Sequence, residues 1–172
     1  MMDPSADPFA APAPDADAPI ERFGAKDAND LSWANLLNAY TCTECGRCTS
    51  ECPANLTGKK LSPRKIMMDT RDRIEEIGAN IAVNGTFLDD GKSLLGDYIT
   101  NEELWACTSC NACVQACPVD IDPSNIIMKL RNFATMEESS APGALNAMMT
   151  NVENNGAPWP FNQMDRANWI NE

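Results

Sequence analysis

The sequence predicts a mainly α-helical protein, because helix-start signals recur along the chain while strand signals are nearly absent. Ser62-Pro63 and Asp122-Pro123 each place a capping side chain before a proline, a residue favoured at the first helical position. Thr100 and Glu103 have the spacing of a capping box. Asn84-Gly85 is a candidate turn, but it lacks the alternating flanks of a hairpin. The length of 172 residues, 44% of them apolar, suits one domain with tails.

The first predicted helix starts near Leu31, where Ser32 or Asp30 can cap it. Its apolar residues are spaced i, i+3 and i+4, which places them on one face: Trp33, Leu36 and Leu37. We expect this helix to deliver Tyr40 and Cys42 to the first group of cysteines.

The second predicted helix spans residues 63–77, with Gly78 as its expected end and with apolar residues at roughly helical spacing: Ile66, Met67, Ile74 and Ile77. A shorter helix is predicted from Thr100 into the second group of cysteines. The helix after Asp122-Pro123 is expected to bury Ile126, Ile127, Leu130 and Phe133. The apolar run in residues 144–149 indicates one more helix.

Composition divides the chain into three parts. Residues 1–30 are rich in proline, alanine and aspartate and are expected to form a disordered or extended tail, because this composition buries too little apolar surface. Residues 31–150 are the expected helical domain, and residues 151–172 an extended C-terminal tail. The N-terminal tail is interpreted as a spacer, with a docking strap as the alternative.

All eight cysteines fall into two copies of the spacing C-x-x-C-x-x-C-x-x-x-C-P. This is the ligand run of a protein with two [4Fe-4S] clusters, in which the fourth cysteine of each run ligates the other cluster. We therefore expect cluster I to be held by Cys42, Cys45, Cys48 and Cys117, and cluster II by Cys107, Cys110, Cys113 and Cys52. Each run closes with a proline, Pro53 or Pro118, which ends the loop and redirects the chain.

The spacing also predicts the backbone of each loop. Thiolates at i, i+3 and i+6 reach three irons of a cubane only from a tightly wound loop. The residue after the second cysteine should therefore tolerate left-handed angles, and it is Gly46 in one run and Asn111 in the other.

Two other uses of cysteine are disfavoured. A structural zinc site draws its ligands from two separated pairs, whereas each run here has four cysteines within eleven residues. A disulfide framework is typical of secreted domains, and no signal peptide is recognisable. The chain has no histidine, which excludes histidine-ligated haem, a Rieske centre and a histidine-based triad within it. A net charge of -12 argues against nucleic acid as a partner.

The cysteine runs, separated by 54 residues from Pro53 to Ala106, resemble those of the alpha-helical ferredoxin module. The segments YTCTECGRCT (40–49) and LSPRK (61–65), with the Pro-Trp tail at 155–159, Arg166 and Trp169, are most similar to heterodisulfide-reductase-related iron-sulfur oxidoreductases. The resemblance covers about residues 31–170. It implies a mainly α fold, an alpha-helical ferredoxin with two 4Fe-4S clusters, preceded here by the extended tail.

The same resemblance implies a function. Members of this family relay electrons between a flavin or CCG-domain partner and a quinone-linked membrane subunit of a redox complex. Larger members add a CCG domain or a membrane-spanning segment, and this chain shows neither, so we expect a separate subunit or a module of a longer protein. With no spare thiol, it is expected to be a non-catalytic electron-transfer subunit, cytoplasmic or peripheral at the inner face of the membrane. An iron-sulfur redox sensor or, more distantly, a zinc-stabilised interaction module are the alternatives.

Several residues near the runs have candidate supporting roles. A basic cluster is expected either to steer a partner or to form a solvated helix face paired with Asp69 and Asp72: Lys59, Lys60, Arg64, Lys65, Arg71 and Arg73. Arg47, inside the first run, is a candidate for tuning a reduction potential. Trp105 and Tyr40, each two residues before a run, are expected to shield the clusters.

Overall fold

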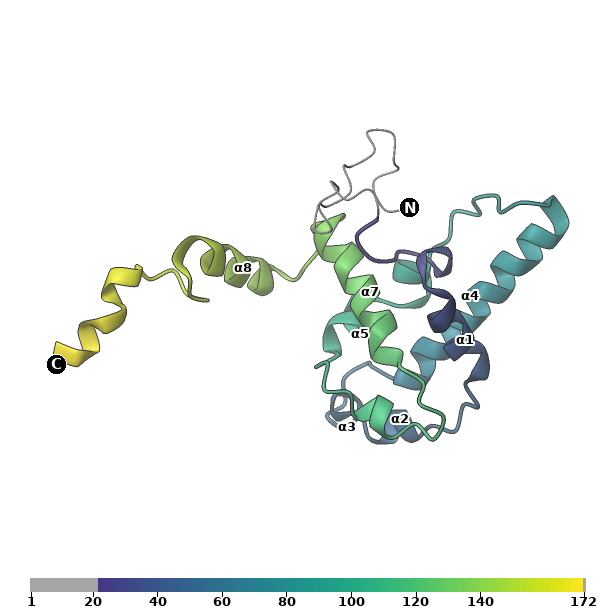
Figure 1. The fold of residues 1–172 in the computed structure, drawn as a ribbon, viewed down its shortest axis with the longest axis horizontal. Coiled ribbons are helices and arrows are strands. Elements are labelled where there is room, and N and C mark those ends of the chain that lie inside the picture. Colours follow the sequence, from purple (N-terminus) through teal and green to yellow (C-terminus); the bar gives the residue numbers. More distant parts are fainter. Residues whose placement is uncertain (1–21, 172) are drawn as a thin grey trace, which may run out of the picture.

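The computed structural model describes residues 22–171, and within them it contains helices but no β-strand. Figure 1 shows a helical domain from which α8 extends sideways into an arm that leads to the C-terminus. The mainly α-helical fold predicted from the sequence is confirmed. Most of the predicted N-terminal tail, residues 1–21, lies outside the described residues.

The long helices α4 and α7 form the centre of the domain and pack against each other. Helix α1 lies against α4, α5 lies against α7, and the short helices α2 and α6 pack together at one end. In chain order the elements are η1 (Ala28–Asp30), α1 (Trp33–Thr41), α2 (Arg47–Ser50), α3 (Pro53–Leu56), α4 (Pro63–Asn84), η2 (Leu94–Tyr98), α5 (Asn101–Ala106), α6 (Ala112–Gln115), α7 (Pro123–Met136), α8 (Gly143–Asn155) and η3 (Gln163–Asn171).

The predicted helix starts are confirmed. The side chains of Ser32, Ser62 and Asp122 accept hydrogen bonds from the backbone N–H three residues later, which satisfies one free donor at the start of α1, α4 and α7. Thr100 and Glu103 form the expected capping box at α5. These caps are local, which is why the sequence alone predicts them.

Helix α4 is longer than predicted, because it continues through Gly78 and ends at Asn84, with Gly85 as its C-cap. A glycine inside a helix costs only about 1 kcal/mol relative to alanine, so it need not end one. Gly85 has φ of 80°, the left-handed conformation typical of a helix end, and its N–H donates to the Ile81 carbonyl at 2.8 Å.

The apolar face predicted for α1 is largely exposed. Trp33 is 77% exposed and Leu37 52%, whereas Asn35 and Ala39 are buried against the domain. Leu36, the third residue of the predicted face, is partly buried and packs against the core, and Ala39 is fully buried. The core instead comes from α4, α5, α7 and η2, and the predicted buried residues of α7 are all part of it: Ile126, Ile127, Leu130 and Phe133.

The packed domain begins earlier than the boundary predicted at residue 31. Ala25 and Ala28 are buried, and the Ala25 N–H donates to the Lys129 carbonyl of α7 at 3.0 Å. The cations of Arg22 and Lys26 lie 5.2 and 5.7 Å from the centre of the Phe133 ring. Contacts with α7, more than a hundred residues away in sequence, hold this segment in place.

A buried arginine ties three segments together. Arg73 of α4 is fully buried and donates to the carboxylates of Asp27 and Asp90 and to the Lys92 carbonyl. Asp27 caps η1, and Asp90 lies in the loop before η2. The hydrogen bonds from Arg73 lower the pKa of Asp90 to about 2.

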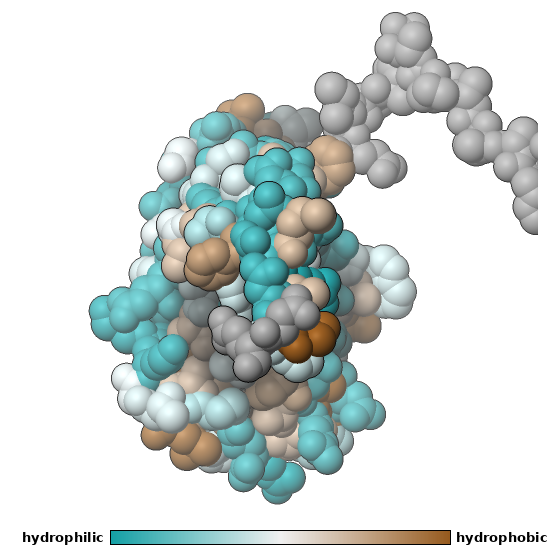
Figure 2. All heavy atoms as spheres, turned by 90° about the vertical axis from the view of Figure 1, so that its left-hand side faces the viewer, coloured by the Kyte–Doolittle hydropathy of each residue, from teal (hydrophilic) through white to brown (hydrophobic). Residues whose placement is uncertain are grey.

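The arm exposes apolar side chains instead of burying them. No residue of α8 is buried, and its larger apolar residues, with those that follow, are exposed: Met148, Met149, Val152, Trp159, Phe161, Met164, Trp169 and Ile170. Figure 2, which views the molecule from the free end of the arm, shows apolar and hydrophilic side chains interspersed on this surface. The predicted extended tail at 151–172 is instead the end of α8 followed by η3.

Candidate iron-sulfur site

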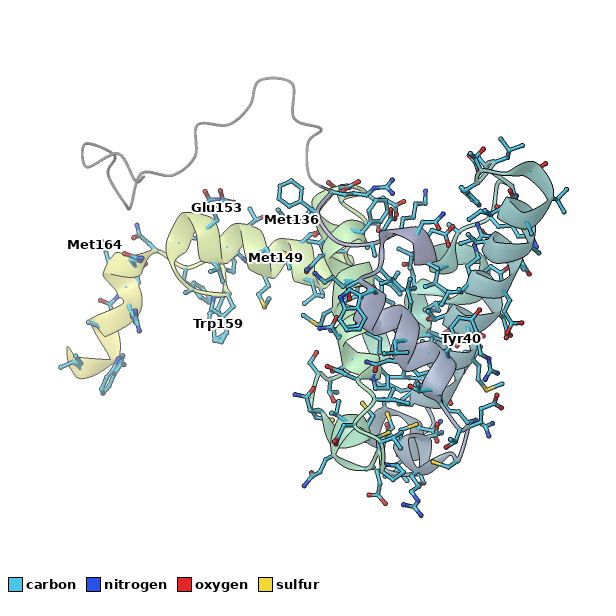
Figure 3. All side chains as sticks on the ribbon, turned by 45° about the vertical axis from the view of Figure 1, so that its right-hand side comes forward. Tyr40, Met136, Met149, Glu153, Trp159 and Met164 are labelled. Atoms are coloured by element: carbon cyan, nitrogen blue, oxygen red, sulfur yellow. The ribbon has the colours of Figure 1, made fainter. Side chains whose placement is uncertain are left out.

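The two cysteine runs have the same local structure. Cys42 follows the last residue of α1, and Cys107 follows the last residue of α5. A loop then leads into a short helix that carries the third cysteine, Cys48 in α2 and Cys113 in α6. The fourth cysteine, Cys52 or Cys117, comes directly before a proline. Figure 3 shows sulfur atoms gathered at the end of the domain where these loops meet.

Four of the predicted ligands line one hollow of about 390 Å³, counted out to the solvent: Cys42, Cys45, Cys48 and Cys117. The other four line a second hollow of about 330 Å³: Cys107, Cys110, Cys113 and Cys52. Cys113 also lines the first hollow, so the two hollows are neighbours. The structure thus brings the fourth cysteine of each run to the three cysteines of the other run.

The donor sets fit [4Fe-4S] groups. Within residues 22–171, no three cysteine or carboxylate side chains converge on one point as ligands of a single ion do. The thiols are spread around the walls of each hollow, together with apolar side chains such as Met67 and Ile121 in the first and Leu61 and Ile127 in the second. Each cluster, when bound, supplies a one-electron carrier.

The loop backbone has the predicted left-handed residues and two more. Gly46 has φ of 81° and Asn111 of 60°, which confirms that the residue after the second cysteine turns the loop. Glu44 and Ser109, two residues after the first cysteine of each run, also have positive φ, 58° and 54°. Such angles cost energy for residues other than glycine, so the surrounding contacts must hold them.

Burial and hydrogen bonds shift the pKa values of the thiols in different directions. Burial raises the pKa of Cys113 to about 11 and also raises the pKa of Cys48, whereas hydrogen bonding, first from the Ala112 backbone, lowers the pKa of Cys110. Iron binds thiolates, so it must displace protons from the buried thiols. The N–H groups of Ser109 and Ile121 donate to the sulfurs of Cys107 and Cys117, each at 3.4 Å.

Two arginines outside the runs contact these loops. Arg71 of α4 forms an ion pair with Glu44 in the first loop. Arg131 of α7 donates to the carbonyls of Leu104 and Cys107 and to the Ser109 hydroxyl, and its guanidinium stacks 4.9 Å from the Trp105 ring. Sequence reasoning missed the role of Arg131 because it lies 24 residues from Cys107.

The predicted basic cluster is mainly a set of ion pairs. Lys65 pairs with Asp69 as expected, and also with Glu103, while Arg71 is 4.0 Å from Asp72. Lys60 pairs with Glu102, and Arg73 is the buried residue described above. Arg64 is exposed and lines the first hollow. Arg47 is exposed in the groove between α2 and α6, so its tuning role stays a prediction.

The two aromatic residues before the runs differ. The Trp105 side chain packs against the core and under Arg131, and its Nε1 is buried without a hydrogen-bond acceptor in the described part of the chain. Tyr40, labelled in Figure 3, is 50% exposed and does not line the first hollow, so the expected shielding fails there. Tyr40 instead continues the exposed apolar face of Trp33 and Leu37.

Comparison with known proteins agrees with this site. Residues 41–121, which hold both runs, match the 4Fe-4S dicluster domain family. This segment is therefore a 4Fe-4S dicluster domain, and the chain carries two [4Fe-4S] clusters. It is homologous to FadF-like iron-sulfur oxidoreductases and to the C subunits of heterodisulfide reductases, which confirms the resemblance inferred from the motifs.

The chain is 34% identical to the probable iron-sulfur-binding oxidoreductase FadF of Bacillus subtilis, over 88% of this chain and 26% of the relative. It is 31% identical to the EtfAB:quinone oxidoreductase of Syntrophomonas wolfei, over 88% of this chain and 24% of the relative. The C subunit of the ferredoxin/F(420)H(2)-dependent CoB-CoM heterodisulfide reductase of Methanosarcina acetivorans is 31% identical, over 63% of this chain and 54% of that protein. The chain thus spans about a quarter of the first two relatives.

Proposed function

We propose that this chain relays electrons through its two clusters between a flavin or CCG-domain partner and a quinone-linked membrane subunit. The observation that carries this proposal is the pair of neighbouring hollows, the first lined by five thiols and the second by four, with Cys113 in both. Two one-electron carriers held side by side form a path that a single site does not provide. The chain needs no catalytic residue of its own for this role.

We also propose the crossed ligand assignment. Cluster I is held by Cys42, Cys45, Cys48 and Cys117, and cluster II by Cys107, Cys110, Cys113 and Cys52. The support is that Cys117 lines the hollow of the first run and Cys52 the hollow of the second.

The proposed partners draw on the relatives. One relative is named as a quinone oxidoreductase for EtfAB, and others are subunits of heterodisulfide reductases. Among residues 22–171 no helix is both long enough and apolar enough to cross a membrane. We propose a cytoplasmic chain that reaches the inner face of the membrane through its partner. The exposed apolar residues of α1, beside the first run, are typical of a protein contact.

Spectroscopy of anaerobically purified protein tests the electron-carrier function. We expect visible absorption that bleaches on reduction, iron and sulfide for two cubanes per chain, and paramagnetic signals from two interacting centres. Stoichiometric zinc with no visible absorption would contradict the proposal and support a zinc-stabilised module.

Purification from native membranes tests the partners. A tagged chain should copurify with a flavoprotein or CCG-domain protein and with a membrane subunit that reduces or oxidises quinone, and added quinone should reoxidise the reduced clusters of that assembly. Recovery of the chain alone, with reduced clusters that quinone does not reoxidise, would contradict the assignment of partners. It would not contradict the assignment of the clusters.

A further inference from the structure

The two halves of the domain match beyond their cysteines. Each half has a long helix that starts with a proline, Pro63 in α4 and Pro123 in α7. Eight residues after each proline stands an arginine, Arg71 or Arg131. Each arginine reaches the residue two positions after the first cysteine of a run, Glu44 or Ser109. The same contact, from an arginine of a long helix to a cysteine loop, thus occurs at equivalent positions in both halves.

The contact is made where each loop is strained. Glu44 and Ser109 both have left-handed backbone angles, which neither residue type favours. Arg131 donates to the Cys107 carbonyl at 2.6 Å and to the Ser109 hydroxyl at 3.3 Å, so it spans the start of the loop. Arg71 contacts the carboxylate of Glu44, which lies between Cys42 and Cys45 in the first run. Each arginine therefore fixes a loop to a long helix.

The charge at the two contacts differs. Glu44 lines the first hollow and neutralises Arg71 with its carboxylate. Ser109 is uncharged, and among residues 22–171 no carboxylate lies within ion-pair distance of Arg131. Burial lowers the pKa of Arg131, but an arginine stays charged near neutral pH. The second loop consequently faces a positive charge that no local carboxylate offsets.

Charge near an iron-sulfur cluster changes its reduction potential, because the reduced form is more negative. We propose that Arg71 and Arg131 are matched positioning residues, one for each cluster loop, and that the residue each one meets, Glu44 or Ser109, sets the two potentials apart. The inference rests on the proposed function only in requiring that the two loops hold different clusters.

Other charges lie close to the site. Arg64 lines the first hollow, and its equivalent in the second is Ser124. The absolute order of the two potentials depends on these residues as well. Substitution at positions 44 and 109 isolates the part that belongs to the arginine contacts.

Potentiometric titration followed by electron paramagnetic resonance tests the proposal. Glu44→Gln keeps a hydrogen-bond acceptor for Arg71 and removes the negative charge, so the midpoint of one cluster should rise. Ser109→Glu adds a carboxylate beside Arg131, so the midpoint of the other cluster should fall. We expect each shift to be about tenfold in the reduction equilibrium, or about 59 mV for one electron.

The matched control is Glu153→Ser, the loss of a carboxylate on α8 in the arm, which should move neither midpoint. If Ser109→Glu binds fewer than two clusters, Arg131→Gln serves in its place, and the same midpoint must fall. The positioning role is tested with Arg131→Lys, which keeps the charge and loses the two-carbonyl contact. This variant should keep its midpoint but release iron to a chelator several-fold faster than the unchanged protein.

The outcomes separate the two proposals. If the protein without substitutions lacks two reducible cubanes, that result refutes the proposed function before any variant is compared. Two cubanes whose midpoints ignore Glu44→Gln and Ser109→Glu, or shift as they do in Glu153→Ser, would overturn the inference and leave the function in place. Equal shifts of both midpoints in each variant would also overturn it, because the contacts would then act only through net charge.

Discussion

Cys52 belongs to the first run by sequence and lines the second hollow by position. It is buried beside Pro53 at the start of α3, whereas Cys45 of the same run is exposed. This placement is possible because the short helix α2 carries the chain from one hollow to the other.

Cys52→Ser should therefore damage the cluster of the second run. We expect loss of about half of the iron. The paramagnetic signal that is lost should be the one whose reduction midpoint responds to Ser109→Glu. Cys117→Ser is the matched variant and should remove the signal that responds to Glu44→Gln. Loss of the first-run signal in Cys52→Ser would refute the crossed assignment.

Arg73 is the buried charge on which the N-terminal side of the domain depends. Its side chain is fully buried, and the two carboxylates that accept its hydrogen bonds, those of Asp27 and Asp90, are only 15% and 24% exposed. Removing one partner of a buried pair leaves the other charge uncompensated.

Arg73→Met should lower the free energy of unfolding by about 3 kcal/mol or more. Anaerobic denaturation followed by circular dichroism measures the change, with Arg166→Met in the exposed arm as the control. If the denaturation midpoint of Arg73→Met equals that of the control, the Arg73 network makes no net contribution to stability.

At the scale of elements, two glycines have opposite roles. Gly24 has φ of 96°, and a Cβ atom there would lie 2.3 Å from the Lys129 carbonyl oxygen of α7. Gly78 lies inside α4, and a Cβ atom there would meet nothing within 4 Å. Only the packing distinguishes them, because each is a lone glycine in the sequence.

Gly24→Ala should undock the segment around η1 from α7 and destabilise the domain by more than about 1 kcal/mol, since the new atom overlaps backbone and the φ is unfavourable. Gly78→Ala should stabilise α4 by about 0.5–1 kcal/mol. Hydrogen exchange of the Ala25 amide reports the docking directly. Unchanged protection of that amide in Gly24→Ala would contradict the close approach seen here.

At the scale of the whole molecule, the domain and the arm are separate in their packing. The core draws on residues from Ala25 to Ala134, while no residue of α8 is buried. Figure 3 shows Met149 and Trp159 on one side of α8 and Glu153 on the other, an amphipathic arrangement.

Removal of residues 143–172 should therefore leave both clusters in place. We expect the thermal midpoint to change by less than about 3 °C, which corresponds to roughly 1 kcal/mol for a domain of this size. The visible spectrum and a thermal scan under anaerobic conditions measure this. A large drop in the midpoint would place the arm against the domain.

Local signals in the sequence predict much of this molecule. Caps such as Ser62 and Thr100 act within three residues, and the cysteine spacing reflects the size of a cubane, so both are readable without a fold. The end of α4, the exposure of Trp33 and the docking of Ala25 were predicted wrongly or missed. The last two depend on which distant surface a residue meets, which the local sequence does not record. The end of α4 was missed for a local reason, because Gly78 is tolerated inside the helix and the left-handed cap is at Gly85.

The sequence by itself determined the helical class, the two clusters and the left-handed turns at Gly46 and Asn111, because these follow from short-range geometry and from the chemistry of thiolates. Only the tertiary structure decided that Cys113 stands between the two hollows and that Arg71 and Arg131 meet the loops. Those contacts join residues 22 to 27 positions apart, so they exist only once α4 has packed against the first loop and α7 against the second.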